Sequence, residues 1–149
     1  MVTPKQLGHL VIKVRDLEKS EEFYTNVLGL TVMNKRPGVM TFMSADEGMS
    51  HELALVPVGE DAPGPESTRV GLYHMAWEMG SFEDLKQLYT VIKENNVEVL
   101  NVGDHGISLG VYFCDPDGNE IEAYYEMPKD EWPAEGDLFE GAFPGQLEG

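Results

Sequence analysis

The order of the expected secondary structure repeats once along the chain, and this repeat limits the fold more than any other feature. In the first half, a strand, a helix and three further strands are expected at residues 7–14, 16–30, 31–36, 39–44 and 51–58. In the second half, the same order is expected at residues 72–79, 81–96, 97–103, 109–115 and 119–126. His9 lies eight residues before Leu17, and His74 lies eight residues before Phe82. The repeat therefore predicts two tandem βαβββ modules, at 7–58 and 72–126.

The boundaries of these segments carry local signals. Asp16 and Ser81 are suitable N-caps for the two helices, because their side chains can accept hydrogen bonds from the first turn. The segment 59–71 contains prolines and glycines and predicts a connecting loop. Prolines and glycines also recur in 134–149, which predicts an extended C-terminal arm after a single domain at 1–133.

Charge and cysteine content exclude several functional classes. Asp and Glu outnumber Lys and Arg by 27 to 10, which gives a formal net charge of -17 and opposes binding to nucleic acid or to an anionic membrane surface. The single cysteine, Cys114, permits neither an intrachain disulfide nor a thiolate metal cluster. The N-terminal sequence has no signal-peptide pattern, and no run of about 18 apolar residues is present. We expect a cytoplasmic protein.

Two histidines and one carboxylate occupy related places in the repeat. His9 and His74 lie in the first strand of each module, and Glu122 lies in the last strand of the second. Side chains alternate along a strand, so Glu120, Glu122 and Tyr124 share one face. If the modules pack side by side, two imidazoles and one carboxylate can meet in a cleft. This arrangement suits non-haem Fe(II), which needs open positions for substrate and O2. Taken singly, each residue also suits an ordinary strand.

The motifs resemble those of the vicinal-oxygen-chelate superfamily, and within it those of single-domain extradiol ring-cleaving dioxygenases. The matching sequences are "LGHLVIKVRDLEKSEEFYTNVLGL", "SHELALVPV", "GLYHMAWEM" and "DHGISLGVYFCDPDGNEIEAYYE". The resemblance covers about residues 6–133, and its last motif is the most specific. It implies an α+β fold in which the two βαβββ modules form a curved mixed sheet around a metal cleft.

The resemblance also implies roles for single residues. His9, His74 and Glu122 correspond to the metal ligands, with Fe(II) as the expected metal and Mn(II) as the alternative. His51 corresponds to the active-site acid and base, and Tyr112 to the tyrosine that binds a substrate oxygen. His105 is expected beside Tyr112, although it precedes that tyrosine by seven residues, a shorter step than the family's usual one.

The activity implied is the opening of a catechol-type aromatic diol by O2, next to its hydroxyl groups. The expected partners are the diol and O2, without nucleic acid or membrane, in a homo-oligomer that is a dimer or larger. Two alternatives remain. One is a glyoxalase-like isomerase or epimerase, in which Glu52 or His51 would supply a fourth ligand. The other is a ligand-sequestering protein of the antibiotic-resistance type.

Overall fold

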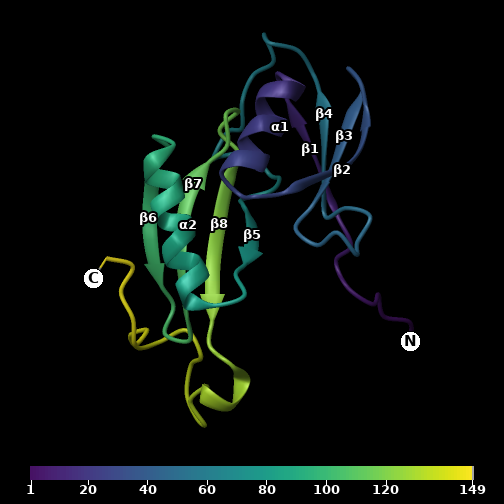
Figure 1. The fold of residues 1–149 in the computed structure, drawn as a ribbon. Coiled ribbons are helices and arrows are strands. Elements are labelled where there is room, and N and C mark those ends of the chain that lie inside the picture. The colour runs from purple at the N-terminus through teal and green to yellow at the C-terminus, as the bar shows by residue number, and fades with distance from the viewer. Residues whose placement is uncertain (149) are drawn as a thin grey trace. The chain divides into compact units, whose positions relative to one another are not determined.

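The chain divides into two units, each built around one sheet. The computed structural model describes residues 1–148 and separates Met1–Gly64 from a second unit that begins at Pro65. This boundary lies within the predicted loop 59–71. Each unit has the order β-α-β-β-β and a four-stranded mixed sheet (Figure 1). The prediction of an α+β fold with two βαβββ modules is confirmed, whereas the assignment of residues 1–133 to a single domain stays a prediction.

The first unit pairs its first and last strands in parallel. Its elements are β1 (Leu10–Val14), α1 (Leu17–Asn26), β2 (Thr31–Arg36), β3 (Met40–Ser44) and β4 (Leu53–Pro57). The sheet order is β1-β4-β3-β2, with β1 parallel to β4 and the other pairs antiparallel. Asp16 caps α1 by accepting a hydrogen bond from the Lys19 amide, as predicted. Tyr24 on α1 is fully buried and, with Leu53 and Leu55 of β4, belongs to the core.

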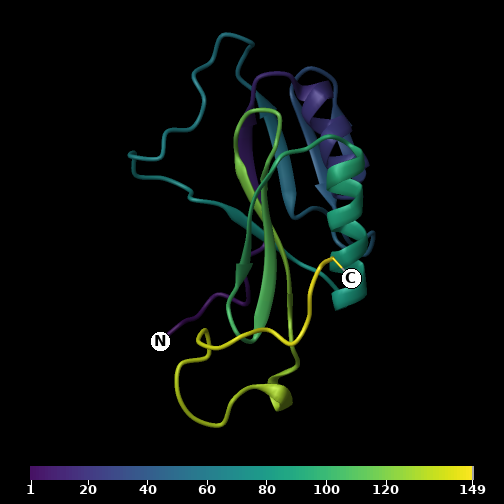
Figure 2. The ribbon, with the colours of Figure 1, turned by 90° about the vertical axis from the view of Figure 1, so that its left-hand side faces the viewer.

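The second unit repeats this topology. Its elements are β5 (Met75–Glu78), α2 (Phe82–Glu94), β6 (Val99–Asp104), β7 (Ser108–Cys114) and β8 (Glu120–Glu126). The sheet order is β5-β8-β7-β6, and β5 is parallel to β8. Ser81 caps α2 through the Asp84 amide. Helix α2 lies along one face of the sheet (Figure 2), and its Leu85 and Ile92 are fully buried, as are Phe113 and Ile121 of the sheet.

The turn between β7 and β8 is built on Asp115. Its buried carboxylate accepts hydrogen bonds from the amides of Asp117 and Asn119 and from the Asn119 side chain, all at 2.9 Å. Gly118 takes a φ of +87°, which few other residues adopt without strain. The turn sequence thus fixes an antiparallel register in which Tyr112 lies directly opposite Glu122.

The three predicted strands that include a histidine begin later than the sequence suggests. The segments expected from residues 7, 51 and 72 begin as strands at Leu10, Leu53 and Met75. Sheet pairing, rather than β-propensity, determines these starts, because both β1 and β4 enter their parallel ladder at the pair Leu10 and Leu53. As a result, His9, His51 and His74 all lie just before a strand, where the backbone is not committed to the sheet.

The C-terminal segment after β8 packs on the second unit. It leaves β8, passes through the short 3-10 helix Lys129–Glu131 and crosses the ends of the strands toward α2 (Figures 1 and 2). Phe143 is buried, with ring centroids 5.2 Å from Phe82 and 6.1 Å from Tyr125. Among the residues described, 1–148, we find no helix with the length and apolar character needed to cross a membrane.

Candidate functional site

His74 lies between two carboxylates in the second unit. Its Nε2 atom is 3.3 Å from Oε2 of Glu122, and its Nδ1 atom is 3.2 Å from Oε2 of Glu120. The parallel pairing of β5 with β8 explains this arrangement, because Met75 pairs with Ile121 and Ala76 pairs with Glu122. His74 therefore lies level with Glu120. Alternation along β8 places both carboxylates on the same face of the strand, as the sequence predicted.

This arrangement fits a bound divalent metal. A first-row metal with bonds of about 2.1 Å to nitrogen and oxygen holds neighbouring ligand atoms roughly 3 Å apart, close to the His74–Glu122 spacing. Histidine ligands usually direct their other ring nitrogen toward a carboxylate, and Glu120 occupies that place. The Nδ1 atom is buried, and its approach to Glu120 is too poorly aligned to count as a hydrogen bond. The donor set of one imidazole and one carboxylate suits Fe(II) or Mn(II).

Tyr112 and His105 form a hydrogen-bonded pair beside these groups. The Tyr112 hydroxyl lies 3.0 Å from Nε2 of His105, and the Tyr112 ring centroid is 5.5 Å from that of His74. Burial, followed by the nearby Glu122 carboxylate, raises the pKa of Tyr112 to about 12. The phenol therefore keeps its proton at neutral pH and can donate a hydrogen bond. His105 was expected beside Tyr112 although it precedes it by only seven residues, and in the structure its ring contacts the Tyr112 hydroxyl.

These side chains line one cavity of the second unit. The cavity has a volume of about 400 Å³, and His74, His105, Tyr112, Glu122 and Tyr124 contribute to its walls. Its size is in the range that binds small organic ligands. An imidazole, a carboxylate, a phenol and a second imidazole thus face one space that can hold a small aromatic molecule.

Gly110 on β7 makes room for the Glu122 carboxylate. A Cβ atom at this position would overlap Oε1 of Glu122 and lie 3.2 Å from its carboxyl carbon. We expect Gly110→Ala to displace the carboxylate and to weaken metal binding about 10- to 100-fold, an effect typical of altered support around a metal ligand. Metal content after reconstitution and desalting, measured by elemental analysis, checks this expectation.

Gly71→Ala is the matched control, because a Cβ there meets no atom within 4 Å. It should retain metal like the unchanged protein. Circular dichroism should show that both variants are folded. Equal metal retention by the two variants would mean that Gly110 does not position Glu122.

The first unit holds a separate pair of imidazoles. The ring centroids of His9 and His51 are 4.4 Å apart, and the Phe42 ring meets His51 edge-on at 5.1 Å. The parallel register of β1 and β4 produces this proximity, since both histidines precede the same end of adjacent strands. Ser50 Oγ lies 3.0 Å from Nδ1 of His51 and orients the ring.

Glu52, which follows His51, forms hydrogen bonds within the first unit. Its carboxylate accepts hydrogen bonds from the Ser44 hydroxyl and from the Ala45 amide at 3.2 Å. It therefore supports the loop after β3, and this engagement weighs against the fourth-ligand role considered for the isomerase alternative.

A comparison with protein families gives a match over residues 6–123. The matching model is described as the Glyoxalase/Bleomycin resistance protein/Dioxygenase superfamily. The chain belongs to this superfamily. The name itself joins three kinds of protein, so membership establishes the fold and leaves the reaction to be proposed.

Relatives of this superfamily member include named dioxygenases. The chain is 34% identical to Biphenyl-2,3-diol 1,2-dioxygenase 3 of Rhodococcus globerulus over 122 residues. This alignment covers 81% of this chain and 63% of that protein. The chain is 31% identical to Catechol-2,3-dioxygenase of Bacillus subtilis (strain 168), over 85% of this chain and 43% of that protein. The chain thus spans less than two thirds of either dioxygenase. A solved glyoxalase/dioxygenase of Nostoc punctiforme matches with a TM-score of 0.70 and 26% identity, over 86% of this chain and 97% of that one.

The site residues predicted from the sequence lie in two groups, one in each unit of the structure. His74, His105, Tyr112 and Glu122 lie together in the second unit, and His9 and His51 lie together in the first. Among residues 1–148, no three His, Cys, Asp or Glu side chains are arranged as a metal site. The combination of His9 with His74 and Glu122 stays a prediction.

Two residues that support the site, Glu120 and Gly110, were not predicted from the sequence. Strand alternation already placed Glu120 on the same face as Glu122, but the sequence did not show that Glu120 lies beside His74. Nothing in the sequence indicated the role of Gly110, because that role depends on the Glu122 side chain of the neighbouring strand.

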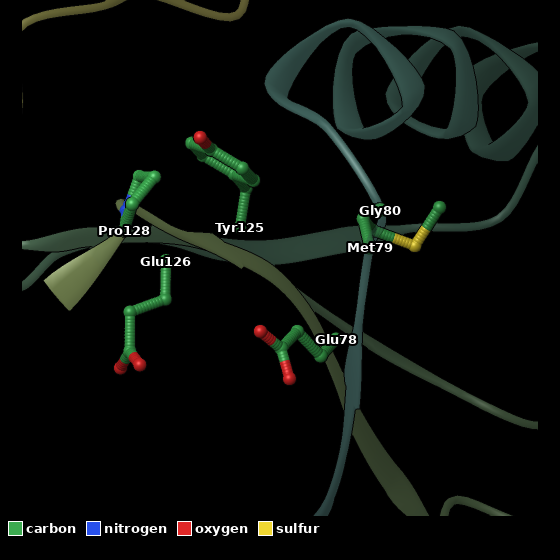
Figure 3. Close-up of a pocket in the computed structure, with 6 residues that line it drawn as sticks. All are labelled: Glu78, Met79, Gly80, Tyr125, Glu126 and Pro128. Carbon is green, nitrogen blue, oxygen red and sulfur yellow. The ribbon is translucent and has the colours of Figure 1, made fainter.

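A second hollow on the same unit lacks these groups. It has a volume of about 420 Å³ and is lined in part by Glu78, Tyr125 and Glu126. The carboxylates of Glu78 and Glu126 extend to one side of the strands and Tyr125 to the other (Figure 3). The hollow is lined by none of the predicted site residues.

Proposed function

We propose that this protein is a metal-dependent extradiol dioxygenase of the catechol 2,3-type, which opens an aromatic diol next to its hydroxyl groups. The observation that carries the proposal is His74, with Glu122 at one ring nitrogen and Glu120 at the other, beside a protonated Tyr112. The identities of 34% and 31% to two named ring-cleaving dioxygenases support the same reaction.

We infer that His9, His74 and Glu122 would hold the metal, with Fe(II) preferred over Mn(II). When bound, the ion would supply a Lewis acid with open positions for the diol and O2. The protein would act in the cytoplasm as a homo-oligomer. Each of these assignments is open to direct measurement.

The other residues bind substrate and move protons in this proposal. His51 would accept the proton of a substrate hydroxyl and return it later, because an imidazole exchanges protons near neutral pH. Tyr112 would donate a hydrogen bond to a substrate oxygen, which the high pKa of its phenol permits. His105 would hold the Tyr112 hydroxyl in place through their 3.0 Å contact.

Anaerobic reconstitution tests this proposal. Protein loaded with Fe(II) and then given catechol and oxygen should consume the two in equal amounts and form a yellow ring-opened product. Zn(II)-loaded protein is the control and should consume no oxygen. A protein that converts a glutathione hemithioacetal with Ni(II) or Zn(II), and takes up no oxygen with any diol, would belong to the isomerase alternative.

A further inference from the structure

One wall of the His74 cavity comes from outside the sheet. Phe139, in the C-terminal segment, lines the same space as Glu122, Tyr112 and His105. Its side chain is 62% exposed, among the more exposed large apolar residues of the second unit. A single exposed phenylalanine is common on protein surfaces, so exposure by itself assigns no role. Its position at a cavity with polar walls is the feature that needs an explanation.

The backbone on both sides of Phe139 is fixed against the turn that carries His105. Gly106 follows His105 in this turn, and a Cβ on it would overlap the Glu140 carbonyl and lie 3.2 Å from the Leu138 carbonyl oxygen. The carbonyls that flank Phe139 therefore pack directly on the turn. Replacing Gly106 would separate the two segments, and its φ of +69° also favours glycine.

Asp104 ties the same two segments together. Its Oδ1 atom accepts hydrogen bonds from the Gly106 amide and from the Phe143 amide, both at 3.0 Å. The Phe143 ring is buried beside Phe82 and Tyr125. The backbone that carries the exposed Phe139 ring is thus held between fixed points at the cavity, so little backbone entropy is lost when a ligand packs on the ring.

We propose that Phe139 is a substrate-binding residue that packs against the ring of the aromatic diol, with the C-terminal segment forming an aromatic wall of the substrate site. This inference rests on the proposed function and identifies its substrate as one with an apolar aromatic face and a polar edge. Tyr112, His105 and Glu122 suit the oxygen-bearing edge, and the phenyl ring suits the face.

Phe139→Ala tests this assignment. We expect it to weaken the binding of catechol and of 2,3-dihydroxybiphenyl about 10-fold, which is typical for the loss of an aromatic contact and its buried area. KM should rise by a similar factor while kcat changes less than about twofold, because the contact is made before and after the reaction. Phe139→Tyr should restore binding. Leu100→Ala, which removes a 47% exposed side chain outside the cavity, is the matched control and should bind like the unchanged protein.

Binding measured without oxygen, by titration calorimetry, separates this inference from the proposed function. If the protein binds catechol through Phe139 but consumes no oxygen, the proposed dioxygenase function is refuted and the role of Phe139 in ligand binding stands. Unchanged affinity in Phe139→Ala, or an equal loss in Leu100→Ala, would overturn the wall while ring cleavage in the unchanged protein stood. A protein that binds neither diol would overturn both.

Discussion

Glu122→Gln is expected to abolish metal retention and to lower ring-cleavage activity more than 100-fold. Glu122 is the one carboxylate in the proposed ligand set, and its Oε2 atom lies 3.3 Å from Nε2 of His74. Glutamine keeps the length of the side chain but removes the negative charge that a divalent ion requires. Elemental analysis of the reconstituted and desalted variant, together with oxygen uptake, measures both effects.

The same variant should leave the metal-free fold intact. Glu122 is only 9% exposed, and glutamine has nearly the same volume as glutamate, so the substitution leaves no cavity. We therefore expect the midpoint of thermal unfolding without metal to stay close to that of the unchanged protein. Lost function without lost stability distinguishes a ligand from a structural residue.

Glu78→Gln is the matched control, because Glu78 is a solvent-exposed carboxylate on the neighbouring strand β5. It should retain metal and activity. If Glu122→Gln held as much metal as Glu78→Gln, then Glu122 would have no role as a ligand.

The repeat and the caps of the two helices could be predicted because they depend on short stretches of sequence. Asp16 and Ser81 each act on the next turn of their own helix, and the Asp115 turn is complete within a few residues. The facing of Glu122 followed from strand alternation, a rule that is equally local. Short-range sequence patterns were therefore enough to predict the two modules and which side chains of β8 face the cavity of the second unit.

The rest depends on pairing between distant segments. The start of β5 is set by its partner β8, and this pairing brings Glu120 to His74. The same applies to Phe139, which reaches the cavity only because Asp104 and Gly106 fix a segment more than thirty residues further along the chain. No periodicity in the C-terminal sequence indicates such a contact.

His51→Ala is expected to retain iron and to lower kcat about 10²- to 10⁴-fold, the range that a positioned acid or base contributes. The Ser50 hydroxyl, 3.0 Å from Nδ1, orients the ring and leaves Nε2 to exchange a proton. Phe42 holds the ring edge-on at 5.1 Å. Metal content and single-turnover rates, measured side by side, separate the lost proton transfer from lost metal.

Two further measurements make this prediction specific to the imidazole of His51. Added imidazole should restore part of the rate in His51→Ala, because a diffusible base can occupy the space that the side chain leaves. Ser50→Ala removes only the orienting hydroxyl and should cost less than His51→Ala. Since His51 lies 4.4 Å from His9, a loss of iron in His51→Ala would instead show that this ring supports the metal ligand of the first unit. Full activity with full iron would exclude His51 from the reaction.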